Sequence, residues 1–238
     1  MTDVVYSIDK NSPRLKYEAK TLGKEECKRR NVHKGQIKLL LSEIDFLNDF
    51  AQAGDHVVYA GAADGRHIPA LDGMFHDLQL SWHLFDPAKF SMNVIRWSHL
   101  VGDRGKMYNK CFESSDALAF KSTGNPRILF ICDMRTSKGC NSIPEDEQVV
   151  STCQLSCLKL YSSNHDSVWR QVMQNQECQM KWVLAMNPTA CCLKFRGAFD
   201  YNGASKRHET FENLDGELRI QAWHGRNSTE VSTVVCHN

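Results

Sequence analysis

The sequence predicts an α/β protein with a central, mostly parallel sheet flanked by helices. Two observations lead to this fold class. Short apolar runs over residues 56–60, 82–85 and 127–132 read as strands, and segments with helical spacing alternate with them. After Arg127 the last of these strands is continuously apolar over residues 128–132, which is typical of strands buried on both faces of a parallel sheet. A length of 238 residues is enough for one large domain or two small ones with a proper core.

The elements of the first half follow from local patterns. Apolar residues recur at helical spacing from Gly35 to about Phe50, which predicts an amphipathic helix. The strand 56–60 then runs into a glycine-containing turn, and Ile68, Leu71 and Phe75 share the apolar face of a following helix. A second strand covers 82–85, while the pattern over residues 107–120 is ambiguous.

The second half begins with the strand 127–132 and continues through a polar loop, residues 135–144. A long helical region follows, which we interpret as two helices broken near residues 162–164. The second helix is expected to start from an N-cap at Asp166 and to end before Asn187 and Pro188. Two further strands are expected near 190–196 and 217–223.

Charge and cysteine content limit the class of protein. The formal net charge is only +1, yet residues 10–38 hold ten Lys/Arg and three Glu. We interpret residues 1–33 as a basic arm that packs on a single domain over residues 34–238 and attracts a polyanion, although a solvated arm would have the same composition. Ten cysteines without a secretory segment predict reduced thiols in the cytoplasm, and scattered Cys and His predict no metal centre. No apolar stretch is long enough for a membrane span.

A candidate ligand loop lies after the first strand. The sequence Gly61-Ala62-Ala63-Asp64-Gly65 allows close approach of backbone to a ligand at the carboxyl end of a sheet. Asp86, which ends the next strand, is placed to hydrogen-bond ribose hydroxyls. Either S-adenosylmethionine or a dinucleotide would fit this pattern, and the lack of G-x-G-x-x-G spacing favours the methyl donor. An ordinary tight turn remains an alternative.

Four charged residues interrupt or adjoin apolar runs: Lys38, Asp133, Lys194 and Glu217. Ionised groups beside buried strands cost free energy unless they are paired. Each has an ordinary explanation when taken alone. Lys38 could flank a helix with its amine in water, Asp133 could cap the loop after its strand, and Lys194 could protect an edge strand from aggregation.

Taken together, these stretches resemble a known family, the poxvirus cap-specific mRNA (nucleoside-2'-O-)methyltransferases that also act as poly(A) polymerase regulatory subunits. The resemblance runs in the family's order over about residues 1–225. The matching segments are GQIKLLLSE (35–43), VVYAGAADGRHI (57–68), CDMRTSKG (132–139), NPTACCLKFR (187–196) and GELR (216–219). The resemblance implies a methyltransferase with a Rossmann-like fold. Such an enzyme would use S-adenosylmethionine as the methyl donor and release S-adenosylhomocysteine.

The resemblance also implies three sets of site residues. The catalytic set is Lys38, Asp133, Lys194 and Glu217. The S-adenosylmethionine site is lined by Gln36, Tyr59, Gly61, Gly65, Asp86 and Asp133. The cap and RNA are bound by Tyr17, Arg135, Arg196, Phe199 and Asp200, with the methylated guanine between the two aromatic rings.

The mechanism that the resemblance implies has Lys194 as the base that accepts the proton of a ribose 2'-hydroxyl, with Asp133 and Glu217 orienting the lysines. The loop after Asp86 continues Pro87-Ala88-Lys89 where the family has an arginine that contacts the donor, and Lys89 could take its place. The expected partners are 7-methylguanosine-capped RNA and a poly(A) polymerase catalytic subunit, and no membrane is expected to be bound. The expected location is the cytoplasm of an infected cell or the virion. Two alternatives stay open. One is an FtsJ-like enzyme that methylates internal ribose, and the other is a non-catalytic RNA-binding subunit of the polymerase.

Overall fold

The computed structural model describes residues 34–134 except 123 and 125, and residues 166–196, 217–219 and 230–236. The predicted arm over residues 1–33 and the first helix of the 145–164 region lie outside these ranges. The described elements, in chain order, are α2 (Lys34–Phe50), β1 (His56–Ala60), α3 (Ile68–Met74), η1 (His76–Leu78), β2 (Ser81–Phe85), α4 (Met92–Val101), η2 (Gly102–Arg104), β3 (Gly105–Tyr108), α5 (Ser114–Ala119), β4 (Ile128–Cys132), α7 (Asp166–Met186), β5 (Ala190–Arg196), β6 (Glu217–Arg219) and β7 (Glu230–Cys236).

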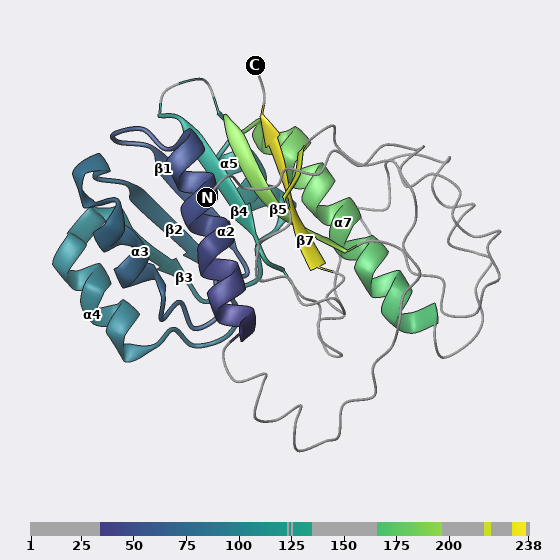
Figure 1. Cartoon of the computed structure of the whole chain (residues 1–238), viewed down its shortest axis with the longest axis horizontal. Coiled ribbons are helices and arrows are strands. Elements are labelled where there is room, and N and C mark those ends of the chain that lie inside the picture. The colour runs from purple at the N-terminus through teal and green to yellow at the C-terminus, as the bar shows by residue number, and fades with distance from the viewer. Residues whose placement is uncertain are drawn as a thin grey trace.

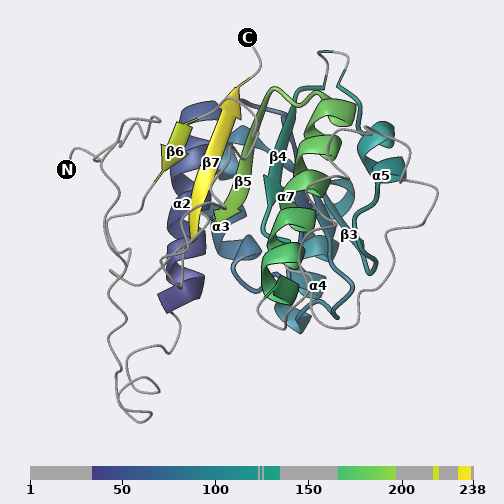
Figure 2. The ribbon, with the colours of Figure 1, turned by 90° about the vertical axis from the view of Figure 1, so that its right-hand side faces the viewer.

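These strands form one seven-stranded sheet in the order β3-β2-β1-β4-β5-β7-β6 (Figures 1 and 2). The pairs from β3 to β5 are parallel, whereas β7 runs antiparallel to both β5 and β6. The first five strands follow the order 3-2-1-4-5 of doubly wound sheets. The predicted mostly parallel sheet is therefore confirmed, and the antiparallel β7 is an addition that the sequence analysis did not contain.

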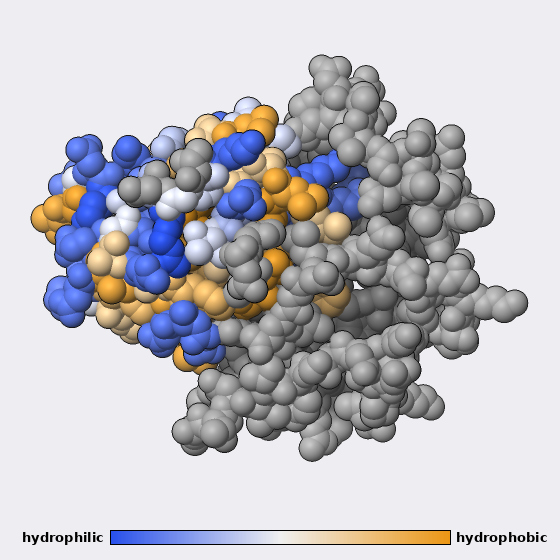
Figure 3. Space-filling model, turned by 90° about the horizontal axis from the view of Figure 1, so that it is seen from above, coloured by the Kyte–Doolittle hydropathy of each residue, from blue (hydrophilic) through white to orange (hydrophobic). Residues whose placement is uncertain are grey.

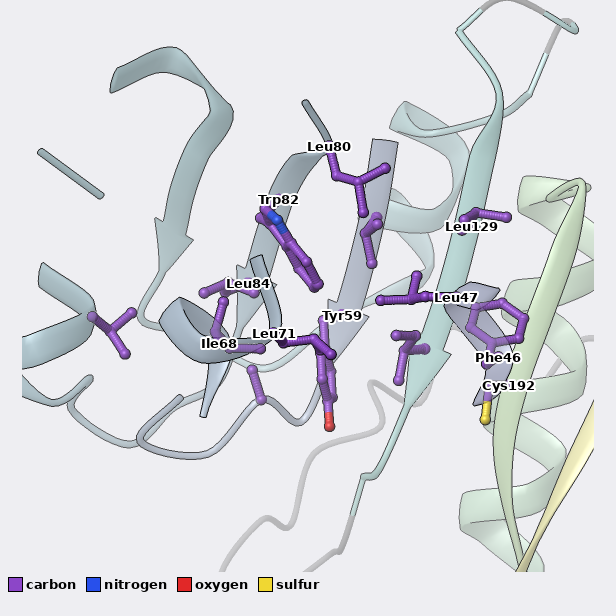
Figure 4. Packing of buried hydrophobic residues seen from close by; sticks show 14 of the residues in the cluster. Phe46, Leu47, Tyr59, Ile68, Leu71, Leu80, Trp82, Leu84, Leu129 and Cys192 are labelled. Carbon is purple, nitrogen blue, oxygen red and sulfur yellow. The ribbon is translucent and has the colours of Figure 1, made fainter. Parts of the chain in front are cut away.

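Helices cover both faces of the sheet, as Figures 1 and 2 show together. Side chains alternate along each strand, so β1 sends Val57 and Tyr59 to one face and Val58 and Ala60 to the other. The first face packs against α2, α3 and α4, and its core includes Phe46, Tyr59, Leu71 and Trp82 (Figure 4). The second face packs against α5 and α7 around Phe130 and Trp182. Three layers therefore enclose two apolar cores.

Local signals explain where several elements begin and end. Ser91 caps α4 because its Oγ accepts a hydrogen bond from the N–H of Val94, 3.5 Å away. Helix α7 ends at Met186, and Asn187 after it adopts a left-handed backbone with φ +50°. The predicted end before Asn187 and Pro188 is confirmed.

On the face shown in Figure 3, hydrophobic and hydrophilic residues of the described ranges lie interspersed. Among the described helices, none is both long enough and apolar enough to cross a membrane. No group of three metal-binding side chains occurs within the same ranges.

Candidate functional site

The carboxyl ends of β1 and β4 meet where the strand order changes direction. The chain leads from β1 to β2 on one side of β1, while β4 is the neighbour of β1 on its other side. Open α/β sheets bind ligands outside the carboxyl ends of strands at such a switch point. Asp133 follows β4 directly, and its N–H donates to the carbonyl of Ala60 at the end of β1, at 3.0 Å. The two strand ends are thus held together at this edge.

Gly61 makes this close approach possible. Its φ is +81°, which favours glycine, and a Cβ at this position would lie 2.9 Å from backbone atoms of both Asp133 and Met134. No side chain fits there unless the end of β4 moves. The glycine predicted for backbone approach is therefore required by the chain's own packing.

The glycine loop, residues Gly61–Gly65, is fixed from both ends. The N–H groups of Gly61 and Ala62 donate to the carbonyl of Phe85, at 2.9 and 3.2 Å, and that of Gly65 donates to the carbonyl of Ala62. Gly65 has φ +65°, and a Cβ there would lie 3.3 Å from the side chain of Val94 in α4. The loop is consequently a preformed turn at the carboxyl edge.

Asp86, at the end of β2, binds this loop through its carboxylate. Oδ2 accepts a hydrogen bond from the N–H of Ala63 at 2.7 Å, and Oδ1 accepts one from the N–H of Ala88 at 2.8 Å. A carboxylate has about four lone-pair positions, so each oxygen keeps one for a further donor. Asp86 orders the loop, and its expected contact with ribose hydroxyls remains a prediction.

Lys194 and Asp133 form an ion pair at the same edge. Their Nζ and Oδ1 atoms are 2.5 Å apart, and the side chains are 15% and 16% exposed. Strand β5 lies between β4 and β7, so Lys194 is not on an edge strand and that alternative explanation is wrong. The Nε2 of Gln179 in α7 also donates to the backbone carbonyl of Lys194, at 3.2 Å. A largely buried lysine side chain is thereby placed beside a carboxylate at the carboxyl ends of the strands.

The backbone of Lys38 and Gln36 lies toward this edge. Both residues lie near the start of helix α2. The end of α2 leads into the first residue of β1, and therefore lies toward the amino ends of the parallel strands. At that far edge the side chain of Arg127, just before β4, donates to the carbonyl of Phe50. The side chains of Gln36 and Lys38 are not among those described.

The register places Glu217 on the sheet face of Lys194. Glu217 is opposite Val234, which is opposite Cys192, two residues before Lys194 in β5. Residues two apart on a strand share a face, so Glu217 and Lys194 lie on one face, two strands apart. Arg219, rather than Glu217, is level with Lys194. The side chains of β6 and that of Arg196 lie outside the described residues, as do Tyr17, Arg135, Phe199 and Asp200 altogether.

Tyr59 is enclosed in the core. Its hydroxyl donates to Oε1 of Glu43 at 2.5 Å, and burial together with the nearby charge of Glu43 raises the pKa of Tyr59 well above its usual value of 10.0. His67 places Nε2 3.1 Å from the same oxygen. Sequence reasoning predicted a role for Tyr59 but missed Glu43 and His67. Helical spacing contained a signal, because Glu43 lies three residues after Leu40 and four before Leu47, on the apolar face of α2.

Fold and site together define the class of protein: a Rossmann-like α/β protein with its candidate site at the carboxyl ends of the central strands. Residues 2–160 match the family described as "Poly A polymerase regulatory subunit". The chain belongs to this family, which confirms the resemblance drawn from the sequence.

Two curated relatives come from Myxoma virus, strains Lausanne and Uriarra, and both are named "Cap-specific mRNA (nucleoside-2'-O-)-methyltransferase". Each is 34% identical to this chain over 199 residues, which cover 81% of this chain and 50% of the relative. The chain therefore spans about half the length of these relatives. A solved structure titled "Structure of an Antibiotic Related Methyltransferase" matches 80% of this chain and 89% of its own, with 11% identity and a TM-score of 0.29, a likeness too weak to carry an argument.

Proposed function

We propose that the chain is an S-adenosylmethionine-dependent methyltransferase that modifies the ribose 2'-hydroxyl of the first transcribed nucleotide of 7-methylguanosine-capped RNA. The observation that carries this proposal is the ion pair between Lys194 and Asp133 beside the glycine loop. It combines an amine for proton transfer with a preformed ligand turn at one edge of the sheet. The names of the two Myxoma virus relatives support the same reaction.

The residues at the carboxyl edge suit the methyl donor chemically. Asp86 retains acceptor positions for ribose hydroxyls after binding Ala63 and Ala88. Gln36, Tyr59, Gly61, Gly65 and Asp133 complete the proposed donor site. When bound, S-adenosylmethionine supplies a methyl group on a positively charged sulfur.

Lys194 is the proposed base. In its neutral form, Nζ would accept the proton of the 2'-hydroxyl while that oxygen bonds to the methyl carbon, and the carbon–sulfur bond would break to leave S-adenosylhomocysteine. Asp133 then stabilises the resulting ammonium through the contact already present, and the proton leaves to water, to which the lysine side chain is partly exposed. Lys38 and Glu217 are proposed to orient the acceptor and the amine. Alignment of the reacting atoms supplies most of the rate enhancement.

Cap recognition is the finer part of the proposal. Tyr17 and Phe199 would stack on the two faces of the methylated guanine, with Asp200 near its positive charge. Arg135 and Arg196 would contact RNA phosphates. These five residues are assigned from the resemblance alone.

The test is transfer of a labelled methyl group to short RNAs that differ only at the 5' end. We expect methylation of a 7-methylguanosine-capped RNA and none of the same RNA with a 5' triphosphate or with a 2'-deoxy first nucleotide. Equal methylation of capped and uncapped RNA would identify an internal ribose methyltransferase instead. Lys106→Ala, on the exposed part of β3, is the matched lysine control and should keep wild-type activity.

A second candidate function is favoured by the family description: regulation of a poly(A) polymerase. The measurement is the length of tails made by a poly(A) polymerase catalytic subunit with and without this chain. Longer tails with both wild type and Lys194→Ala would support this role and separate it from methyl transfer. No change in tail length with a two- to tenfold molar excess of the chain would contradict it.

A further inference from the structure

Glu43 is a buried acid in helix α2 that the proposed reaction does not use. Its side chain is 1% exposed, and its Oε1 is hydrogen-bonded to both the hydroxyl of Tyr59 and the imidazole of His67. Its Oε2 has no hydrogen-bond partner among the described residues. Within the described part of the chain, one oxygen thus takes part in two hydrogen bonds and the other in none.

The two partners of Glu43 flank the glycine loop. Tyr59 lies two residues before Gly61, and His67 lies two residues after Gly65. Glu43 itself belongs to the helix that carries Gln36 and Lys38 toward the same edge of the sheet. A single carboxylate therefore connects both ends of the loop to the helix beside it.

Stability alone does not account for this arrangement. A buried carboxylate oxygen without a donor is unfavourable, and apolar residues of similar volume often replace buried charged groups without loss. Asp72 provides a contrast within the same layer, since it accepts from the indoles of Trp82 and Trp97 and from Arg104, so that both of its oxygens are used. Among the described residues only one oxygen of Glu43 has partners, and what distinguishes Glu43 from Asp72 is that these partners flank the glycine loop.

We propose that Glu43 is a positioning residue that holds the glycine loop and α2 in a fixed relation, so that groups from both reach the methyl donor together. The part of this inference that concerns the donor rests on the proposed function. The part that concerns the loop does not.

Hydrogen exchange of the loop amides tests the inference without any ligand. The N–H groups of Gly61, Ala62 and Gly65 are hydrogen-bonded and report on opening of the loop. Glu43→Ala leaves the Tyr59 hydroxyl buried without its acceptor, and we expect the three amides to exchange roughly tenfold faster relative to the amides of β4 in the same molecule. Glu43→Gln keeps a carbonyl oxygen for Tyr59 and should restore much of the protection.

Asp72→Asn is the matched control, because it alters another buried carboxylate in the same layer whose partners do not flank the loop. It should speed exchange throughout the layer with no preference for the glycine loop. His67→Ala is a milder variant that can be measured even if Glu43→Ala does not fold. It should speed exchange of the glycine-loop amides more than that of the β4 amides. Loop amides that change no more than those of β4 in His67→Ala, and in Glu43→Ala where that variant folds, would overturn the inference.

Affinity for S-adenosylhomocysteine, measured by calorimetry, separates this inference from the proposed function. If the wild type binds, Glu43→Ala should bind roughly tenfold more weakly, and an unchanged Kd would contradict the inference. If the wild type does not bind, the proposed function fails, whereas the exchange measurements still decide the role of Glu43.

Discussion

Replacing Gly61 with alanine should disturb both the fold and the site, and the structure allows the effect to be separated into two causes. The backbone φ of +81° makes any L side chain unfavourable by about 1–2 kcal/mol. The added Cβ would also lie 2.9 Å from backbone atoms of Asp133 and Met134. Backbone atoms cannot move aside as the end of a flexible side chain can. Overpacking of this kind typically adds about 1–3 kcal/mol. We expect a total loss of about 2–5 kcal/mol.

Gly54 supplies a control that isolates the steric contact. Its φ is +80°, nearly that of Gly61, but a Cβ there would meet no atom within 4 Å. Gly54→Ala therefore carries only the backbone cost, partly offset by the lower entropy of its unfolded chain, and should lose about 1 kcal/mol. Urea unfolding of both variants measures the difference, and donor affinity should fall only in Gly61→Ala. Equal destabilisation of the two variants would refute the steric reasoning.

Two further effects follow from buried polar groups. Burial lowers the pKa of His83 from 6.5 to about 4, with the positive charges of His56 and Lys106 contributing. As the pH falls, His83 is protonated in the unfolded chain before it is protonated in the folded protein. The free energy of unfolding should therefore be highest above about pH 6.5 and fall as the pH drops toward 4, by roughly 3 kcal/mol at most. Urea unfolding across this pH range should show the slope in the wild type, and a His83→Phe variant with an unchanged slope would contradict the assignment. Asp72→Ala should cost roughly 2–5 kcal/mol, since it leaves two buried indole N–H groups unpaired, and a loss below 1 kcal/mol in the same assay would argue against that network.

The central strands could be predicted because their signals are local. Continuous apolar runs ending in Gly61, Asp86 and Asp133 marked β1, β2 and β4, and the structure places each strand within a residue of its predicted bounds. The ambiguous region 107–120 includes the end of strand β3, Gly105–Tyr108, which lies at the sheet edge and has no fully buried residue. The insertion of β7 between β5 and β6 depends on pairing between strands distant in sequence, which no local pattern encodes.

The residues of the candidate site could be predicted from the sequence where their signal is local, but their contacts could not. Asp133 and Lys194 were each singled out as charges beside apolar strands, and the structure brings them into contact because their strands are parallel neighbours. Their catalytic roles stay predictions. The contacts of Glu43 with Tyr59 and His67 join residues 16 and 24 positions apart, so they required the packing of α2 on the sheet to be known.

The most direct test of the proposed function is methyl transfer by variants of Lys194. Single-turnover rates would be measured on capped RNA at saturating S-adenosylmethionine, for the wild type, Lys194→Ala and Lys194→Arg. The arginine variant keeps a cation beside Asp133, but a guanidinium does not lose its proton in proteins and cannot act as a base. We predict that both variants bind the donor and lose at least about a hundredfold in rate, within the usual contribution of general base catalysis. Transfer by Lys194→Arg at the wild-type rate would contradict the assignment of Lys194 as the base.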